Sequence, residues 1–270
     1  MKRFVLSIIA AVMVVGMVFS PVALAATPTR YVALGDSVAA GAGLPGSEGT
    51  VCDRSPQAYP YKVAAALGTS VTNLACSGAK VDEGIYGEQV RSGTEIPAQL
   101  DVAFVSGTPD LITMTIGAND IRWAQYLRKC QVATCGTTFD NATTAVLRGD
   151  LRVELYWALS QIEQRSDGNP PQVLVNGYYN PISTTTCSDT QQISAGERSW
   201  IRTQTANLNQ AIRSVVQQFA FAEFVPISFA GHEVCSVHPW IQGVRLPAPF
   251  HPYGMAQDAI ANANVRMINR

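Results

Sequence analysis

Four residues of this chain are of the types that cleave an ester by nucleophilic attack. Ser37 follows the apolar run at residues 31–34 and precedes small residues that favour a helix, so we expect its hydroxyl at the end of a strand. A serine that attacks an ester carbonyl needs a base for its proton and hydrogen-bond donors for the oxyanion that forms. Gly78 and Asn119 each supply an amide donor, and His251 is the candidate base.

Ser37 also has a purely structural alternative. Serine is among the best residues for the N-cap of a helix, and an isolated Gly-Asp-Ser favours that role. Catalysis is favoured because Ser37, Gly78 and Asn119 each follow a separate predicted strand. The carboxyl ends of parallel strands meet at one edge of a sheet, so we expect the three residues to converge there.

The elements that would position these residues alternate along the chain. Apolar runs predict five strands, at residues 31–34, 71–74, 110–116, 172–176 and 223–226. Helical patterns lie between and after them, at residues 59–67, 95–105, 125–135, 143–164, 197–220 and 253–267. This alternation predicts an α/β fold: a single domain with a doubly wound, parallel, five-stranded sheet in the flavodoxin-like order.

The composition is that of a globular chain with a sizeable core. Hydrophobic residues make up 47% of the chain, charged residues 14%, and the net charge is only -1. A nucleic-acid surface needs a basic excess on one face, so we expect no nucleic-acid partner. We expect a monomer.

The first 25 residues have the pattern of a signal peptide. Lys2 and Arg3 precede an apolar run at residues 4–19, which is shorter than the roughly 20 residues that span a bilayer. Ala23-Leu24-Ala25 is typical of a cleavage site. We therefore predict a signal peptide over residues 1–25, one domain over residues 26–270, and a secreted, extracellular protein.

An exported chain meets an oxidising environment, in which cysteines pair. Many pairings of the six cysteines are possible, but their order and the loops around them favour Cys52–Cys76, Cys130–Cys135 and Cys187–Cys235. A zinc site is the alternative, and the chain lacks the Cys-x-x-Cys pairs that such sites use. We expect no metal and no cofactor.

Four segments resemble the signature blocks of the SGNH (GDSL) hydrolases. In chain order they are Gly35-Asp36-Ser37-Val38-Ala39-Ala40-Gly41, Ala75-Cys76-Ser77-Gly78-Ala79, Ile116-Gly117-Ala118-Asn119-Asp120 and Phe250-His251-Pro252-Tyr253-Gly254-Met255-Ala256-Gln257. The cysteine layout, with Gly231-His232-Glu233-Val234-Cys235 and Pro239-Trp240-Ile241, resembles the secreted actinomycete esterase and lipase branch. The resemblance implies a flavodoxin-like fold and supports the disulfide pairing. It also implies Ser37 as nucleophile, His251 as base, and an oxyanion hole formed by Ser37, Gly78 and Asn119.

One position departs from the family pattern. Many members have an aspartate three residues before the histidine, where this chain has Ala248. A histidine base needs an acceptor for its second ring nitrogen. We therefore predict a Ser37–His251 dyad in which the backbone carbonyl of Ala248 is that acceptor. Asp36 and Asp120 are expected to brace their turns rather than to orient the base.

The predicted function is a secreted serine esterase or lipase that hydrolyses acyl esters through an acyl-enzyme intermediate. Its expected partner is an acyl ester or lipid, with at most transient contact with lipid surfaces. Phospholipase A activity or acyl transfer would use the same site. Two alternatives belong to other classes of protein. One is a non-catalytic protein that binds lipid or glycan, and the other is a metallohydrolase that uses His232, Glu233 and His238. An acyl chain is favoured by apolar residues expected beside the cleft, namely Leu44, Ile85, Tyr86, Tyr178, Tyr179, Ile182 and Phe250.

Overall fold

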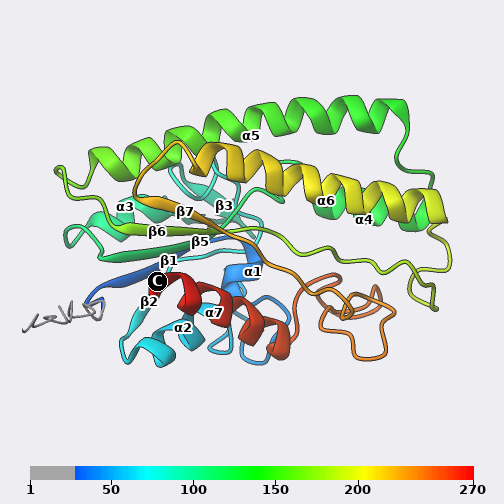
Figure 1. Cartoon of the computed structure of the whole chain (residues 1–270), viewed down its shortest axis with the longest axis horizontal. Coiled ribbons are helices and arrows are strands. Elements are labelled where there is room, and N and C mark those ends of the chain that lie inside the picture. Colours follow the sequence, from blue (N-terminus) through cyan, green and yellow to red (C-terminus); the bar gives the residue numbers. More distant parts are fainter. Residues whose placement is uncertain (1–27) are drawn as a thin grey trace, which may run out of the picture.

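The computed structural model describes residues 28–270 and has a central five-stranded parallel sheet (Figure 1). Its strands are β1 (Tyr31–Gly35), β2 (Val71–Asn73), β5 (Leu111–Thr115), β6 (Gln172–Asn176) and β7 (Ala222–Val225). They are arranged in the order β2-β1-β5-β6-β7. Counted along the chain this is the flavodoxin-like order that the sequence predicts. The predicted signal peptide, residues 1–25, lies outside the described residues.

The middle strands β1 and β5 are buried along their whole length. They pair in register, Tyr31 opposite Leu111 and Gly35 opposite Thr115, so both end at the same level of the sheet. A strand covered on both faces is apolar at nearly every position, which is why these two segments are recognisable in the sequence. Their shared end places the turns after β1 and β5 side by side.

Helices cover both faces of the sheet, as a doubly wound fold requires. Figure 1 shows α5 (Thr138–Gln164) and α6 (Ala195–Val216) on one face, and α2 (Tyr59–Leu67) and α7 (Gly254–Ile268) on the other. The shorter helices are α1 (Ser37–Ala40), α3 (Gln99–Phe104) and α4 (Trp123–Val132). Among residues 28–270 no helix is long and apolar enough to cross a bilayer.

The helix predicted over residues 95–105 is wrong in its first part. Two short antiparallel strands, β3 (Gln89–Arg91) and β4 (Thr94–Ile96), form a hairpin there, and α3 starts only at residue 99. Ser92 and Gly93 between the strands both have positive φ, of 51° and 77°, which is the backbone geometry of a tight hairpin turn. Pro97 then disfavours a helical conformation at the residue before it.

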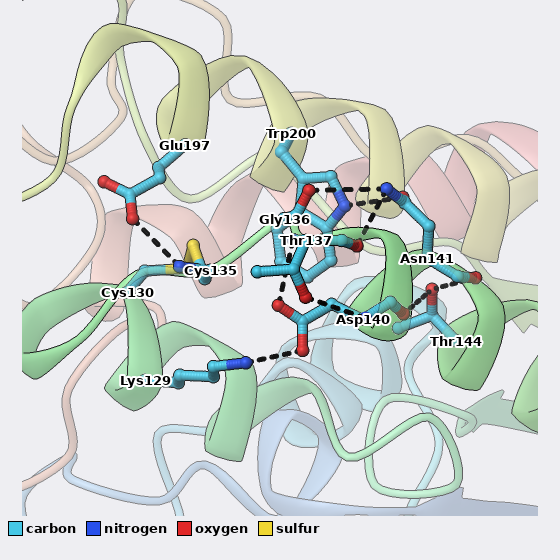
Figure 2. Close-up of polar contacts among 10 residues, drawn as sticks. All are labelled: Lys129, Cys130, Cys135, Gly136, Thr137, Asp140, Asn141, Thr144, Glu197 and Trp200. Atoms are coloured by element: carbon cyan, nitrogen blue, oxygen red, sulfur yellow. Dashed lines mark hydrogen bonds and ion pairs between the residues drawn. A yellow bond between two sulfur atoms is a disulfide. The ribbon is translucent and has the colours of Figure 1, made fainter.

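A cluster of hydrogen bonds joins α4 to α5 and α6 (Figure 2). The Nζ atom of Lys129 lies 2.6 Å from the buried carboxylate of Asp140. Asp140 and Thr137 also bond each other's backbone N–H, a capping box that starts α5 at residue 138 rather than at the predicted 143. From α6, Glu197 accepts the backbone N–H of Cys135 at 2.9 Å. These contacts hold α4 in place.

The three predicted disulfides are present. They join Cys52 to Cys76, Cys130 to Cys135, and Cys187 to Cys235. Cys52–Cys76 links the long loop after α1 to the turn after β2, and Cys130–Cys135 closes the end of α4. Cys187–Cys235 joins the loop after β6 to the loop after β7.

Candidate active site

Ser37 and His251 are hydrogen bonded to each other at the carboxyl edge of the sheet. The Nε2 atom of His251 lies 2.7 Å from the Oγ atom of Ser37, although 214 positions separate the two residues. Ser37 is the first residue of α1, just after β1, and His251 lies three residues before α7. The structure thus brings together the serine and the histidine that the sequence analysis singled out.

Ser37 is not the cap of α1. The N-cap residue is Asp36, whose Oδ1 atom accepts the backbone N–H of Val38 at 2.9 Å. The Ser37 hydroxyl is therefore free to interact with the imidazole. The capping role that was the structural alternative for Ser37 belongs to Asp36.

The second ring nitrogen of His251 has a backbone acceptor, one residue later than predicted. Its Nδ1 atom lies 3.1 Å from the carbonyl oxygen of Pro249. The predicted acceptor, the Ala248 carbonyl, instead accepts the backbone N–H of His251 at 3.1 Å. Phe250 adopts a positive φ of 66°, and its own carbonyl accepts the hydroxyl of Tyr179 at 2.8 Å. The turn from Ala248 to His251 is therefore fixed by a hydrogen bond within it and by a second one from Tyr179.

The environment of His251 favours the neutral imidazole. Burial lowers its pKa below the ordinary value of 6.5, while the carbonyls of Pro249 and Ala248 act in the opposite direction. A histidine that is neutral near pH 7 has a free lone pair on one nitrogen. Since Nδ1 faces a carbonyl oxygen, the proton sits on Nδ1 and the lone pair of Nε2 points at Ser37.

Three candidate hydrogen-bond donors belong to residues that line the same cavity, namely Ser37, Gly78 and Asn119. The backbone N–H groups of Ser37 and Gly78 donate to no group of residues 28–270. The side-chain nitrogen of Asn119 gives one hydrogen to the carbonyl of Ala79, at 2.9 Å, and keeps a second one. Ser37, Gly78 and Asn119 all line one cavity.

Position 78 favours glycine because of its backbone angle φ, and not because neighbouring protein atoms leave no room for a side chain. Its φ is +83°, a left-handed conformation that residues with a Cβ adopt at a cost. A Cβ placed there would come no closer than 3.5 Å to Gln89, an ordinary van der Waals contact.

The cavity has a volume of about 700 Å³ and mostly apolar walls. Trp123 and Leu127 line it from α4, and Val244 and Leu246 line it from the loop before α7. Of the apolar residues expected beside the cleft, three line it: Tyr178, Tyr179 and Phe250. The others do not: Leu44, Ile85 and Ile182 are buried in the core, and Tyr86 hydrogen bonds Glu154.

Two acidic residues of the turns bond backbone amides, as expected. Asp36 accepts the N–H of Val38, and Asp120 accepts the N–H of Val81 at 2.9 Å. Burial raises the pKa of Asp36 to about 6 and that of Asp120 to about 7. Neither carboxylate is hydrogen bonded to the imidazole of His251.

The other two histidines do not form a metal site. The His232 ring stacks on Trp240 with 3.8 Å between ring centroids, and its Nδ1 atom contacts the carbonyl oxygen of His238 at 2.8 Å. Within the described part of the chain, no group of three His, Cys, Asp or Glu residues is placed to hold a metal ion. The metallohydrolase alternative therefore finds no support in the structure.

The fold is that of an established family of ester hydrolases. The chain matches the GDSL-like Lipase/Acylhydrolase family over residues 33–254 and belongs to it. This confirms the resemblance seen in the sequence, and it makes the protein a carboxylic ester hydrolase.

Its relatives are lipases of Streptomyces. The chain is 34% identical to a lipase from Streptomyces rimosus over 238 residues, which cover 85% of this chain and 82% of the relative. Lipase 1 from Streptomyces coelicolor is 30% identical over 239 residues, 84% of this chain and 82% of that protein.

Two crystal structures of Streptomyces proteins are among those that share the fold. The extracellular lipase from Streptomyces rimosus aligns with a TM-score of 0.70 and 29% identity, over 90% of this chain and 100% of that one. The phospholipase A1 from Streptomyces albidoflavus NA297 aligns with a TM-score of 0.65 and 25% identity, over the same shares of the two chains.

Proposed function

We propose that this protein is a secreted esterase or lipase in which Ser37 attacks the ester carbonyl and His251 accepts the serine proton. The observation that supports this most strongly is the 2.7 Å contact between Ser37 Oγ and His251 Nε2. The lowered pKa of His251 and the carbonyl beside its Nδ1 atom both favour the tautomer that can take this proton.

The reaction then runs in two halves. As the Oγ atom of Ser37 bonds to the carbonyl carbon, its proton moves to Nε2 of His251, and the carbonyl oxygen becomes an oxyanion. The N–H groups of Ser37 and Gly78 and the amide of Asn119 bind that oxyanion. When it collapses, the alcohol leaves with the proton from His251, and an acyl-enzyme remains. Water then attacks with the same base, releasing the carboxylic acid and restoring Ser37.

Within residues 28–270, no carboxylate is hydrogen bonded to the imidazole of His251. The carbonyl oxygen of Pro249 holds the Nδ1 proton, and its partial negative charge stabilises the imidazolium that forms during each half reaction. The site therefore works as a dyad in which backbone geometry, set by the turn from Ala248 to His251, replaces a third side chain.

The substrate we propose is an ester with an apolar acyl chain. The walls formed by Trp123, Leu127, Val244, Leu246 and Phe250 suit a hydrocarbon chain. Phospholipase A activity is the second candidate, because Arg128 also lines the cavity and forms no ion pair within residues 28–270. A free guanidinium there matches a phosphate group, and a phospholipase A1 is among the similar structures.

Export is part of the proposal. Residues 1–25 would be removed as a signal peptide, leaving residues 26–270 as one hydrolase domain. The three disulfides support an oxidising location, and one of the similar structures is an extracellular lipase.

The proposal is tested with p-nitrophenyl esters of increasing chain length beside phosphatidylcholine, on the wild type and on Ser37→Ala. Ser37→Ala should lower kcat/KM by at least about 10⁴-fold and abolish labelling by a fluorophosphonate. Ser214→Ala is the matched control, because that hydroxyl lies on α6 and bonds only the Ala211 carbonyl. Retained hydrolysis by Ser37→Ala would exclude Ser37 as nucleophile.

A further inference from the structure

The hydroxyl of Tyr178 lies between two of the turns that form the active site. It accepts the backbone N–H of Ala118 at 3.2 Å and donates to Oδ2 of Asp36. Asp36 in turn accepts the N–H of Val38 through its other oxygen. Ala118 is next to Asn119, and Asp36 and Val38 flank Ser37. A chain of hydrogen bonds thus joins the oxyanion turn to the nucleophile turn.

Hydrogen bonds also join the turn that contains Gly78 to the turn that contains Asn119. The amide of Asn119 donates to the carbonyl of Ala79, and the N–H of Val81 donates to Asp120, both at 2.9 Å. Gly78 belongs to the same turn as Ala79. The relative positions of all three oxyanion donors therefore depend on a connected set of buried and partly buried hydrogen bonds.

Asp36 depends strongly on its hydrogen-bond donors. Its side chain is buried, with only 1% of the residue exposed, and no basic residue among positions 28–270 forms an ion pair with it. A buried carboxylate without a cation remains charged only if hydrogen bonds stabilise it. Burial and the nearby Asp36 raise the pKa of Tyr178 far above 10, so its hydroxyl keeps its proton and donates it to this bond.

We propose that Tyr178 is a positioning residue for the hydrolysis: its hydroxyl holds Asp36 ionised and fixes the Ser37 turn against the Asn119 turn. This inference rests on the proposed function of Ser37 and Asn119. Tyr178 touches neither the Ser37 nor the His251 side chain through a hydrogen bond. Its hydroxyl acts on catalysis through the Asp36 side chain and the backbone of the two turns.

Loss of the Tyr178 hydroxyl should change the pH dependence of Asp36. Burial raises the pKa of Asp36 to about 6, and the hydrogen bond from Tyr178 opposes that rise. The other titratable groups that face Asp36 are the hydroxyls of Tyr59 and Tyr179 and the carboxyl of Asp120, none of which is a cation near pH 7. Without the Tyr178 hydroxyl, Asp36 should therefore take up a proton at a higher pH.

The test compares Tyr178→Phe with Tyr31→Phe. Both changes delete one buried tyrosine hydroxyl; that of Tyr31 bonds Thr113 at 2.8 Å, outside the cavity. For Tyr178→Phe we expect kcat for a p-nitrophenyl ester to fall between about 10- and 100-fold with KM nearly unchanged. The acid limb of its pH profile should move to higher pH. Tyr31→Phe should keep the wild-type kcat and profile.

A second pair of variants separates positioning from a general loss of structure. Because asparagine does not titrate, Tyr178→Phe should no longer move the acid limb when it is made in Asp36→Asn. A wild-type kcat and acid limb in Tyr178→Phe would overturn the inference, as would the same loss in Tyr31→Phe. If Ser37→Ala is inactive and Tyr178→Phe is normal, only this inference fails; if Ser37→Ala is active, the proposed function itself fails.

Discussion

The side-chain amide of Asn119 donates a hydrogen bond to the carbonyl oxygen of Ala79 at 2.9 Å. One hydrogen of the amide is thereby fixed, and the nitrogen is oriented so that its second hydrogen remains available in the cavity. A donor oriented before the reaction needs no rearrangement when the oxyanion forms, which is the condition for efficient electrostatic catalysis.

Removal of this amide should slow the reaction severely. We expect Asn119→Ala to lower kcat/KM by about 10²- to 10³-fold, mainly through kcat, because the amide acts on the charge that develops in the transition state. Steady-state kinetics on a short p-nitrophenyl ester measure this. Asn169→Ala, on an exposed loop, is the control and should be neutral. An Asn119→Ala enzyme with wild-type kcat would remove Asn119 from the oxyanion hole.

Ala248 offers a test of the dyad. An uncharged replacement such as Ala248→Ser should leave activity largely intact, because the ring of His251 is held by the Pro249 carbonyl. Ala248→Asp places a carboxylate near the imidazole, and an opposite charge favours the protonated ring, so the acid limb of kcat/KM should move to higher pH. The pH profiles of both variants test whether the Pro249 carbonyl orients the ring of His251. A collapse of activity in Ala248→Ser comparable to that of His251→Ala would contradict the proposed orientation of the base.

The wild-type pH profile follows from the burial of His251. Because burial lowers the pKa of this residue, the acid limb of kcat/KM should lie below pH 6.5, the ordinary value for histidine. Initial rates from about pH 4.5 to pH 9, with enzyme stability checked at each pH, measure the limb. An acid limb above pH 6.5 would contradict the lowered pKa of His251.

Asp120 should make stability depend on pH. Its pKa is about 7 in the folded protein against 3.8 for a free carboxyl, so the neutral form is favoured on folding. The stability from this group is fully present below the unfolded pKa and is lost as the pH rises through about 7. Melting temperatures between about pH 5 and pH 8 should therefore fall more steeply in the wild type than in Asp120→Asn. Equal slopes would show that Asp120 is not the titrating group.

The contacts of Asp140 in Figure 2 predict a stability effect. Asp140→Ala removes the capping box of α5 and the partner of Lys129, so we expect the free energy of unfolding to fall by about 1–3 kcal/mol. Urea denaturation measures the loss. Asp150→Ala, at an exposed position of the same helix, should change it by less than about 0.5 kcal/mol. Equal losses in the two variants would refute a special role of Asp140.

Strands and most helices of this protein were predictable because their signals are local. The runs that become β1 and β5 are buried on both faces, so most of their positions are apolar. The β3–β4 hairpin was missed because its strands are three residues long and alternate weakly. Its clearest local signal is Ser92-Gly93 followed by Pro97, which outweighs the helical spacing after Glu95.

The site was predictable in its types of residue but not in all its contacts. Ser37, Gly78, Asn119 and His251 stand at strand ends or before a helix, which the sequence marks. Whether Pro249 or Ala248 faces Nδ1 depends on the turn conformation at Phe250, and sequence spacing does not specify that. The role of Tyr178 was hidden as well, because its hydroxyl meets Asp36 only after β1 and β6 have assembled.

The most direct test of the mechanism is to trap the acyl-enzyme. The enzyme is mixed with p-nitrophenyl acetate, quenched in acid within milliseconds to seconds, digested, and analysed by mass spectrometry. We predict one acetyl group on the peptide that contains Ser37, and none in Ser37→Ala or His251→Ala. An acetyl group that accumulates on another residue during turnover, or acetylation of the same peptide in Ser37→Ala, would contradict Ser37 as the nucleophile.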